Sequence, residues 1–144
     1  MKNISREGVV KPSNRDLIRI LCVEHNPNFL KTLRMGLEQR GFTVVTASQG
    51  LEAVTIFEAR SGKFGAVVVG HDTPQIRGLE FVHLIRQKGF KRPIFLTAEN
   101  LSADDSEAYF RFGLSAMFQK PFEINTFAAL IELSLLVSLV PHRD

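Results

Sequence analysis

The chain has 144 residues, a length typical of one globular domain and too short for two. Hydrophobic residues make up 44% of it and charged residues 23%, which excludes a disordered or fibrous chain. Its single cysteine, Cys22, excludes an internal disulfide framework. The 18 basic and 15 acidic residues give a net charge of +3, and several cations lie near the amino terminus, where solvated charge is the usual explanation. Composition therefore does not favour nucleic-acid binding.

The amino-terminal segment lacks the pattern of a signal peptide, and no apolar run approaches the ~20 residues of a membrane span. We therefore expect a cytoplasmic protein that makes no membrane contact. Residues 1–16 are polar and lack periodicity, and Pro12, Ser13 and Asn14 lie within them. The pattern predicts a flexible extension over 1–16, one folded domain over 17–140 and a short tail over 141–144.

From residue 17 onward, five short apolar runs alternate with stretches of helical period. The runs cover residues 18–23, 42–47, 66–70, 93–97 and 116–119. This alternation predicts an α/β domain with five strands, five helices and a parallel sheet. The first helix has a clear start, because Asn26 can cap it and Pro27 can occupy its first turn, and Gly41 follows its end. Ser102 opens the fourth helix in the same way, and Gly113 closes it.

The last helix, over about residues 123–140, is apolar almost all round. A helix that covers one side of a sheet needs only one apolar stripe. We expect Phe127, Leu130, Ile131 and Val137 to form that stripe. Leu136 and Leu139 then point outward on the side of Glu132, which predicts a second buried surface.

In an open parallel sheet, ligands bind beyond the carboxyl ends of the strands. The residues at these ends are Glu24 and His25 after the first strand, 70–73 after the third, Thr97 and Ala98 after the fourth, and Lys120 and Pro121 after the fifth. With this spacing, the set resembles the receiver (CheY-like) domain of bacterial two-component response regulators over roughly residues 17–138. The resemblance implies a doubly wound, flavodoxin-like sheet of five parallel strands in the order 2-1-3-4-5, within a three-layer αβα sandwich.

Receivers carry two acidic residues after the first strand, a phosphate-accepting aspartate after the third, a Thr or Ser after the fourth and a Lys-Pro pair after the fifth. Thr97, Lys120 and Pro121 match this pattern. The acceptor position, counted back from Pro74, holds Gly70, and the second acidic position holds His25. Met117 occupies the switch position, where receivers commonly have Tyr or Phe.

These departures predict a degenerate phosphorylation pocket. Glu24 and Lys120 have opposite charges, so we expect them to form an ion pair, and nothing in the set calls for Mg²⁺. We therefore expect no metal and no cofactor, and we expect the hydroxyl of Thr97 to bond a local backbone group. His25 is interpreted as a polar residue at the rim, and Cys22 as a buried core thiol.

The sequence thus predicts a pseudo-receiver, meaning a receiver without its acceptor aspartate. It would be a phosphorylation-independent protein-interaction module in two-component signalling and not an enzyme. A competing hypothesis is a working phosphorelay receiver that uses Asp72 as acceptor. Three further hypotheses are a zinc site formed by His25, Glu24 and Asp72, a small-ligand domain of flavodoxin type, and nucleic-acid binding by the basic extension.

The resemblance also indicates where a partner binds. Receivers commonly pair through the face made by their fourth helix, fifth strand and fifth helix. We expect a homodimer or a protein partner on this face, with Tyr109, Leu136 and Leu139 at the surface and Phe110 and Phe112 adding apolar area.

Overall fold

The computed structural model describes residues 18–139, with side chains to residue 137. The expected extension over 1–16 and tail over 141–144 lie outside the described residues. The elements in chain order are β1 (Arg19–Val23), α2 (Pro27–Glu38), β2 (Thr43–Ala47), α3 (Gly50–Ala59), β3 (Ala66–Gly70), α4 (Gly78–Gln87), β4 (Ile94–Ala98), α5 (Ala103–Arg111), β5 (Ala116–Gln119) and α6 (Ile124–Leu139).

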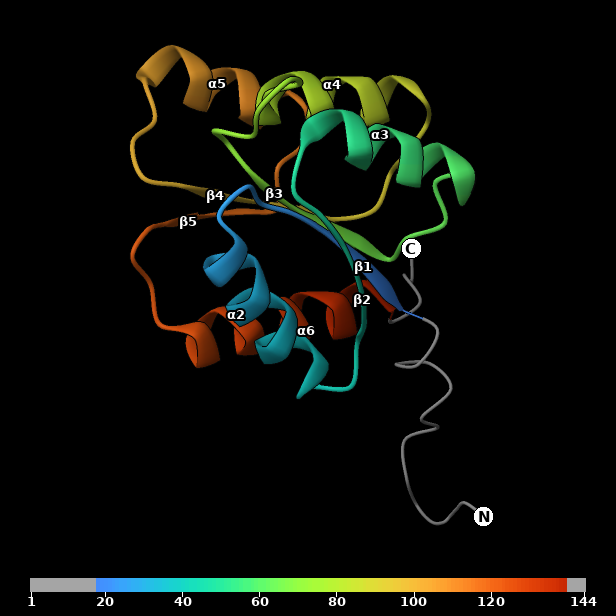
Figure 1. The fold of residues 1–144 in the computed structure, drawn as a ribbon, viewed down its shortest axis with the longest axis vertical. Coiled ribbons are helices and arrows are strands. Elements are labelled where there is room, and N and C mark those ends of the chain that lie inside the picture. Colours follow the sequence, from blue (N-terminus) through green and yellow to red (C-terminus); the bar gives the residue numbers. More distant parts are fainter. Residues whose placement is uncertain (1–17, 140–144) are drawn as a thin grey trace, which may run out of the picture.

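The strands form one parallel sheet in the order β2-β1-β3-β4-β5. Helices α3, α4 and α5 cover one face of the sheet, and α2 and α6 cover the other (Figure 1). This is the three-layer arrangement and strand order that the resemblance predicted. The strand order reverses between β1 and β3, which places a crevice at the carboxyl ends of these two strands.

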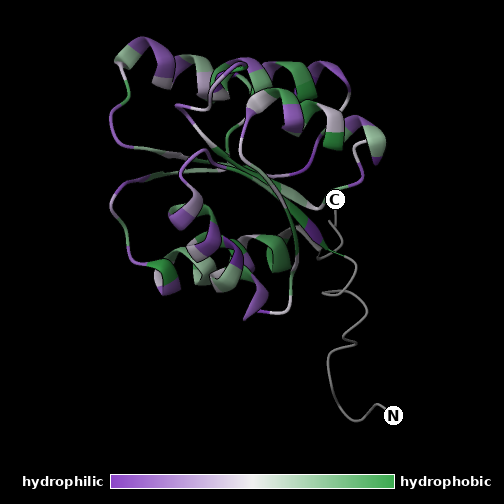
Figure 2. Cartoon of the chain, in the orientation of Figure 1, coloured by the Kyte–Doolittle hydropathy of each residue, from purple (hydrophilic) through white to green (hydrophobic). Residues whose placement is uncertain are grey.

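Alternate side chains of the central strands point into two separate cores. Leu21 and Val67 pack with α3, α4 and α5, whereas Ile20 and Val68 pack with α2 and α6. Because both faces of the sheet are covered, the central strands β3 and β4 are buried at every position, and the centre of the sheet is green in Figure 2. The sheet therefore supports the loops at both ends of its strands.

The predicted helix starts are confirmed. The side chain of Asn26 accepts a hydrogen bond of 3.0 Å from the amide of Phe29, and that of Ser102 accepts one of 3.0 Å from the amide of Asp105. Gly113 follows the end of α5 with a φ of 83°, a conformation that glycine adopts without strain. Local chemistry thus fixes the first turns of α2 and α5 beside the crevice.

The buried stripe of α6 differs from the prediction at two positions. Phe127 and Ile131 are buried as expected, but Leu130 is 46% and Val137 63% exposed. At about 100° per residue, the four buried residues Phe127, Ala128, Ile131 and Leu135 share one arc of about 100° on the helix, and Leu130 and Val137 lie outside this arc, beyond Phe127. Within the described residues, no helix has both the length and the apolar character needed to cross a bilayer.

The side of Glu132 also differs from the prediction. We expected this residue to face outward with Leu136, but its carboxylate lies 3.0 Å from the guanidinium of Arg40, and only 16% of its side chain is exposed. The ion pair turns Glu132 toward the end of α2, because Arg40 lies just beyond that helix. Leu136, one turn further along α6, stays exposed at 43%, as expected.

Candidate functional site

Glu24 lies at the centre of the crevice, directly after β1, and only 1% of it is exposed. Its Oε1 accepts a hydrogen bond of 3.0 Å from Nζ of Lys120, which follows β5. Its Oε2 accepts the amide of Asn26 at 3.0 Å and lies 3.4 Å from Nδ1 of His25. The predicted pairing of Glu24 with Lys120 is confirmed, and it joins the first strand to the last across the crevice.

Gly70 is the last residue of β3 and faces Glu24. A Cβ atom at this position would lie 2.9 Å from Oε1 of Glu24, closer than ordinary packing allows. The carbonyl of Gly70 accepts a hydrogen bond from the hydroxyl of Thr73. The carboxylate of Glu24 therefore lies where the first atom of any side chain at position 70 would have to fit.

A pocket of about 190 Å³ lies between these groups, lined by Glu24, His25, His71, Asp72, Thr97, Ala98, Glu99 and Lys120. Thr97 is 1% exposed, and its hydroxyl has no hydrogen-bond partner among the described residues. The expectation that this hydroxyl bonds a local backbone group is therefore wrong. The backbone carbonyl of Thr97 accepts a hydrogen bond of 3.0 Å from the amide of His71, and the side chain of Thr97 lines the pocket.

Asp72 does not reach the paired charges of the crevice. Its side chain is 60% exposed, and its Oδ1 lies 4.0 Å from the guanidinium of Arg77. His25 is likewise a rim residue, as predicted, with 49% of its side chain exposed. In the part of the chain that the structure covers, no three His, Cys, Asp or Glu side chains are arranged to hold a metal ion, which speaks against the zinc hypothesis.

The oxygen atoms around Glu24 do not form a set of ligands that suits Mg²⁺. This ion requires near-octahedral oxygen ligands. Both carboxylate oxygens of Glu24 already accept hydrogen bonds, and Gly70 offers only a carbonyl that Thr73 uses. An ammonium group 3.0 Å from the carboxylate adds a positive charge where a cation would sit.

His71 and Tyr109 form a second, buried link beside the pocket. The hydroxyl of Tyr109 lies 2.7 Å from Nδ1 of His71, and Nε2 of His71 lies 3.5 Å from Oδ2 of Asp105. Gly78 makes room for the link, since a Cβ there would lie 2.8 Å from the tyrosine hydroxyl. Burial, and then the charge of Asp105, raises the pKa of Tyr109 well above its ordinary value. The link ties the loop after β3 to helix α5.

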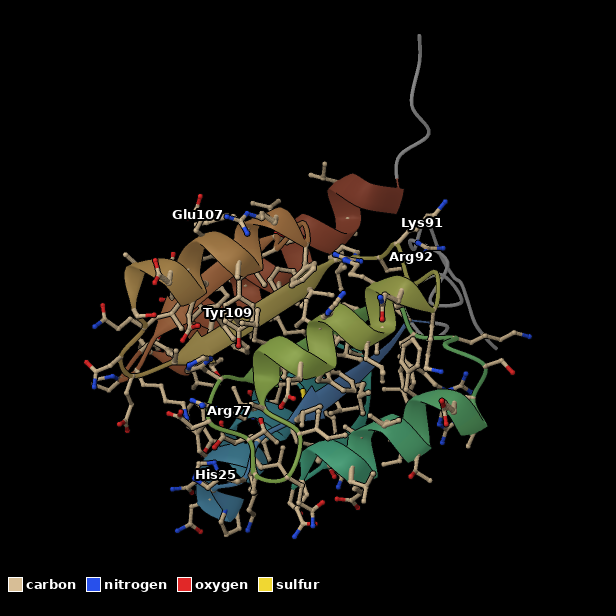
Figure 3. The ribbon with its side chains drawn as sticks, turned by 90° about the horizontal axis from the view of Figure 1, so that it is seen from above. His25, Arg77, Lys91, Arg92, Glu107 and Tyr109 are labelled. Atoms are coloured by element: carbon tan, nitrogen blue, oxygen red, sulfur yellow. The ribbon has the colours of Figure 1, made fainter. Side chains whose placement is uncertain are left out.

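Tyr109 is thus misplaced in the sequence interpretation, which set it on the partner surface. Its exposure is 0%, and Figure 3 shows it on the side of α5 that faces α4, while Glu107 of the same helix lies on the opposite, outer side. Neighbouring Phe110 is the exposed aromatic residue of α5, at 64%. The reason is the hydrogen bond to His71, which gives the buried phenol a polar partner.

The predicted switch residue Met117 and the two other residues predicted at the partner surface, Leu136 and Leu139, lie as follows. Met117 on β5 and Leu136 on α6 are each 43% exposed, and the side chain of Leu139 lies outside the described residues. Leu130, Leu133 and Val137 are exposed as well, so the outer side of α6 carries four exposed apolar side chains with Leu136. We call these four residues the outer face of α6.

Cys22 is a core residue, as predicted. It lies in β1 with an exposure of 0%. Burial, together with the charge of Glu38, raises the pKa of the Cys22 thiol to about 12. Such a thiol is protonated and unreactive at neutral pH.

Residues 20–132 match the model of the response regulator receiver domain family. Among curated proteins, the chain is 30% identical over 121 residues to the alkaline phosphatase synthesis transcriptional regulatory protein SphR of Synechococcus elongatus, covering 79% of this chain and 47% of that protein. It is 28% identical over 125 residues to the transcriptional regulatory protein PrrA of Mycobacterium tuberculosis, covering 87% and 50%. The chain spans about half the length of these two relatives.

Solved receiver domains share the fold. The non-phosphorylated HemR receiver domain of Leptospira biflexa superposes with a TM-score of 0.75 at 28% identity, covering 88% of this chain and 99% of that one. A CheY-like receiver domain protein of Methanospirillum hungatei superposes with a TM-score of 0.78 at 20% identity, covering 85% and 96%.

Proposed function

Because the chain belongs to the response regulator receiver domain family, we propose that it is a pseudo-receiver, which acts in two-component signalling without being phosphorylated. It holds one conformation and presents a surface to a protein partner. The observation that carries this proposal is the paired Glu24 and Lys120 facing Gly70, where the family has its acceptor aspartate.

The charge of the crevice supports this reading. A receiver with three carboxylates and one lysine has excess negative charge, which Mg²⁺ offsets. Here Glu24 and Lys120 neutralise each other at 3.0 Å, and both oxygens of Glu24 have hydrogen-bond partners. The proposal therefore includes the loss of Mg²⁺ binding, with Lys120 acting as a structural cation.

Asp72 is the competing acceptor, and its position argues against that role. Phosphoryl transfer needs an acceptor oxygen held beside the groups that stabilise the transferred phosphate. The Asp72 side chain is largely exposed and lies near Arg77, whereas Lys120 is paired with Glu24. A phosphate on Asp72 would lack the lysine that the family uses.

The link between His71 and Tyr109 supports a fixed conformation. A receiver that switches must move its loops relative to the helices that flank them. In this chain a buried hydrogen bond of 2.7 Å joins the loop after β3 to α5. Breaking it would leave a buried polar atom without a partner, so the link favours a single arrangement of α5.

The proposed partner surface comprises the outer face of α6 together with Met117 and Phe110. These side chains are exposed by 43% or more. They lie on α6, β5 and α5, the elements that correspond to the pairing face of the family. Large apolar side chains gathered on one side of a domain indicate a surface that another protein covers, and the occupant we propose is a second copy or a signalling protein.

Incubation with acetyl phosphate and Mg²⁺, followed by intact-mass measurement, tests the proposal. The wild-type protein is expected to keep its unmodified mass. A parallel sample of the triple variant G70D/E24D/H25D, which restores the acidic set of the family, shows whether the conditions support phosphorylation.

The Asp72→Asn variant separates the two hypotheses. If the wild-type protein gains one phosphate and the Asp72→Asn variant does not, the chain is a working receiver with Asp72 as acceptor, and the pseudo-receiver proposal is overturned. A phosphate gained by both proteins would point to another acceptor and would equally overturn it.

A further inference from the structure

We propose that the end of the sheet opposite the crevice, where the strands begin, binds the phosphate backbone of a nucleic acid. The binding element is a groove of about 660 Å³ whose lining includes Arg19, Lys63, Lys91 and Arg92. We call these four residues the groove cations. This function is independent of the fate of the phosphorylation pocket, since Figure 3 shows Lys91 and Arg92 on the far side of the molecule from His25 and Arg77.

The groove cations lie at the starts of three neighbouring strands. Arg19 begins β1, Lys63 lies shortly before β3, and Lys91 and Arg92 lie shortly before β4. These strands are adjacent in the sheet. Two strand spacings amount to roughly 10 Å, so the cations span the length of a few phosphates on one nucleic-acid strand.

The groove cations lack acidic partners among the described residues. All four are exposed, and none of them forms an ion pair within residues 18–137. The segments that lead into β2, β3, β4 and β5 contain no Asp or Glu. Without these four residues the chain would have one more acidic than basic residue. Like charges that converge on one groove repel each other, and a bound polyanion relieves this repulsion.

Helix dipoles do not explain the groove cations. Cations at the carboxyl end of a helix are stabilised there, which accounts for Arg60 after α3 and Lys88 after α4. The effect falls off within the last turn. Lys63, Lys91 and Arg92 lie further along the loops, and Arg19 begins a strand, so these positions need another explanation.

The loops that carry the cations are held in place by hydrogen bonds. The guanidinium of Arg86 donates to the carbonyls of Phe90 at 2.8 Å and Arg92 at 2.9 Å, which fixes the loop between α4 and β4. Burial lowers the pKa of Arg86 from its ordinary value. The amide of Gly65 donates to the carbonyl of Arg19 at 2.8 Å, which fixes the loop before β3 against β1. Binding therefore needs little ordering of the backbone.

The chemistry of the groove favours phosphates over an acidic protein segment. Protein interfaces depend on exposed aromatic or apolar anchors at their centre. The two rings that line the groove, Phe64 and Phe90, are 4% and 6% exposed and are used in the core. The groove can therefore recognise a ligand only by its charge. This suits the phosphate backbone of a nucleic acid and predicts binding without sequence preference.

The sequence of the amino-terminal segment supports the same occupant. The described chain starts at Ile18, which also lines the groove. The preceding residues 1–17 contain the four basic residues Lys2, Arg6, Lys11 and Arg15 against two acidic ones. Positive charge thus continues along the sequence from the rim of the groove.

Fluorescence anisotropy with a short mixed-sequence DNA duplex and the full chain tests this inference. The logarithm of the affinity should fall linearly with the logarithm of salt concentration, with a slope of about −3.6 from four phosphate contacts and more if residues 1–17 add to them. In the K63Q/K91Q variant the slope should weaken by about 2. Both lysines are exposed and form no ion pair within the described residues, so the variant should keep its circular dichroism spectrum.

The K31Q/R111Q variant is the control for net charge, because it also removes two positive charges from exposed positions, on α2 and α5; Arg111 differs from the groove lysines in pairing with Glu107 at 3.3 Å. It should bind DNA as the wild-type protein does. An equal loss in both variants would reduce the effect to net charge and overturn the proposal, as would absence of binding at low salt. If polyglutamate displaces the duplex at an equal concentration of charges, the groove recognises an acidic protein segment and the nucleic-acid assignment fails.

Discussion

The hydroxyl of Tyr109 lies 2.7 Å from Nδ1 of His71, and this buried hydrogen bond connects helix α5 to the loop after β3. With the ring proton on Nε2, the tyrosine hydroxyl donates to Nδ1, and the Nε2–H group faces the carboxylate of Asp105. One histidine thereby uses both ring nitrogens to hold α5 beside the crevice.

Replacing Tyr109 with Phe should lower the free energy of unfolding by about 1 to 3 kcal/mol, because Nδ1 of His71 loses its partner while it stays buried. Urea unfolding of the wild-type protein and the variant measures this difference. The double variant H71L/Y109F removes both polar groups and should recover part of the loss. A single variant as stable as the wild-type protein would show that the link contributes nothing.

Tyr109 should also resist ionisation while the protein is folded. Burial raises its pKa above the ordinary 10.0, so the folded protein retains a proton that the unfolded chain releases. Its contribution to stability is complete below pH 10 and is lost as the pH rises beyond that value. The chain has one tyrosine and no tryptophan, so the absorbance of tyrosinate reports this residue alone.

In an alkaline titration, tyrosinate should therefore form together with the loss of circular dichroism. Free tyrosine amide in the same buffer provides the reference curve. Ionisation near pH 10 with the spectrum of the fold intact would contradict the buried position of the phenol.

The sequence was sufficient to predict the fold and the crevice because both depend on short-range patterns. Apolar runs and turn residues recur at each strand, and Glu24, Gly70 and Lys120 each lie at a strand end. The parallel sheet then brings these ends together, so their proximity follows from topology. The same reasoning correctly placed His25 at the rim and Cys22 in the core.

The contacts of Tyr109 could not be predicted in this way. Its hydrogen-bond partner His71 lies 38 positions earlier, and the helix that carries Tyr109 also presents Phe110 one residue later. A sequence pattern does not show which of two neighbouring aromatic residues turns inward. On α6, the apolar residues all round the helix concealed the buried stripe for the same reason, and Leu130 was misplaced.

The groove cations have a signal in the sequence. A basic residue precedes or begins β1, β3 and β4, and acidic residues are missing from the segments that lead into four of the strands. The net charge of the whole chain, +3, conceals this signal, because acidic residues elsewhere offset the groove cations. The groove cations come together only because the parallel sheet places the starts of β1, β3 and β4 side by side.

The two members of the ion pair between Glu24 and Lys120 should respond differently to substitution. Lys120→Met leaves the carboxylate of Glu24 buried at 1% exposure without its counter-ion and should cost about 3 kcal/mol or more of unfolding free energy. Glu24→Gln should cost less, because the side chain of Lys120 is 19% exposed and can turn its ammonium group to water.

Urea unfolding of both variants tests this order, and K31M, at an exposed lysine of α2, controls for the loss of a lysine. If the Lys120 and Glu24 variants both matched the wild-type protein, the structural role of Lys120 would be excluded. A larger loss in Glu24→Gln than in Lys120→Met would contradict the burial argument.

Glu123 should make the start of α6 sensitive to acid. Its carboxylate accepts the amide of Thr126 at 2.8 Å and that of Asn125 at 3.1 Å. The hydrogen bonds from Thr126 lower the pKa of Glu123 below its ordinary 4.5. A lowered folded-state pKa stabilises the fold above pH 4.5, and this contribution is lost as the pH falls through the lowered value.

The wild-type protein should therefore be more stable than Glu123→Gln at neutral pH, and the difference should shrink in acid. Thermal unfolding at a series of pH values measures it. A difference that stays constant with pH would show that the charge of Glu123 has no part in capping α6.

The outer face of α6 leads to the last prediction. If a second copy of the chain covers this face, Leu136→Glu should convert a dimer to a monomer, because a carboxylate would be buried against the partner without a counter-ion. Sedimentation velocity at micromolar concentration compares the two masses. Leu51→Glu is the matched control, since Leu51 lies on α3 in the other layer of the sandwich and is 54% exposed. Equal masses for the wild-type protein and Leu136→Glu would exclude pairing through this residue, and dissociation by Leu51→Glu would place the interface elsewhere.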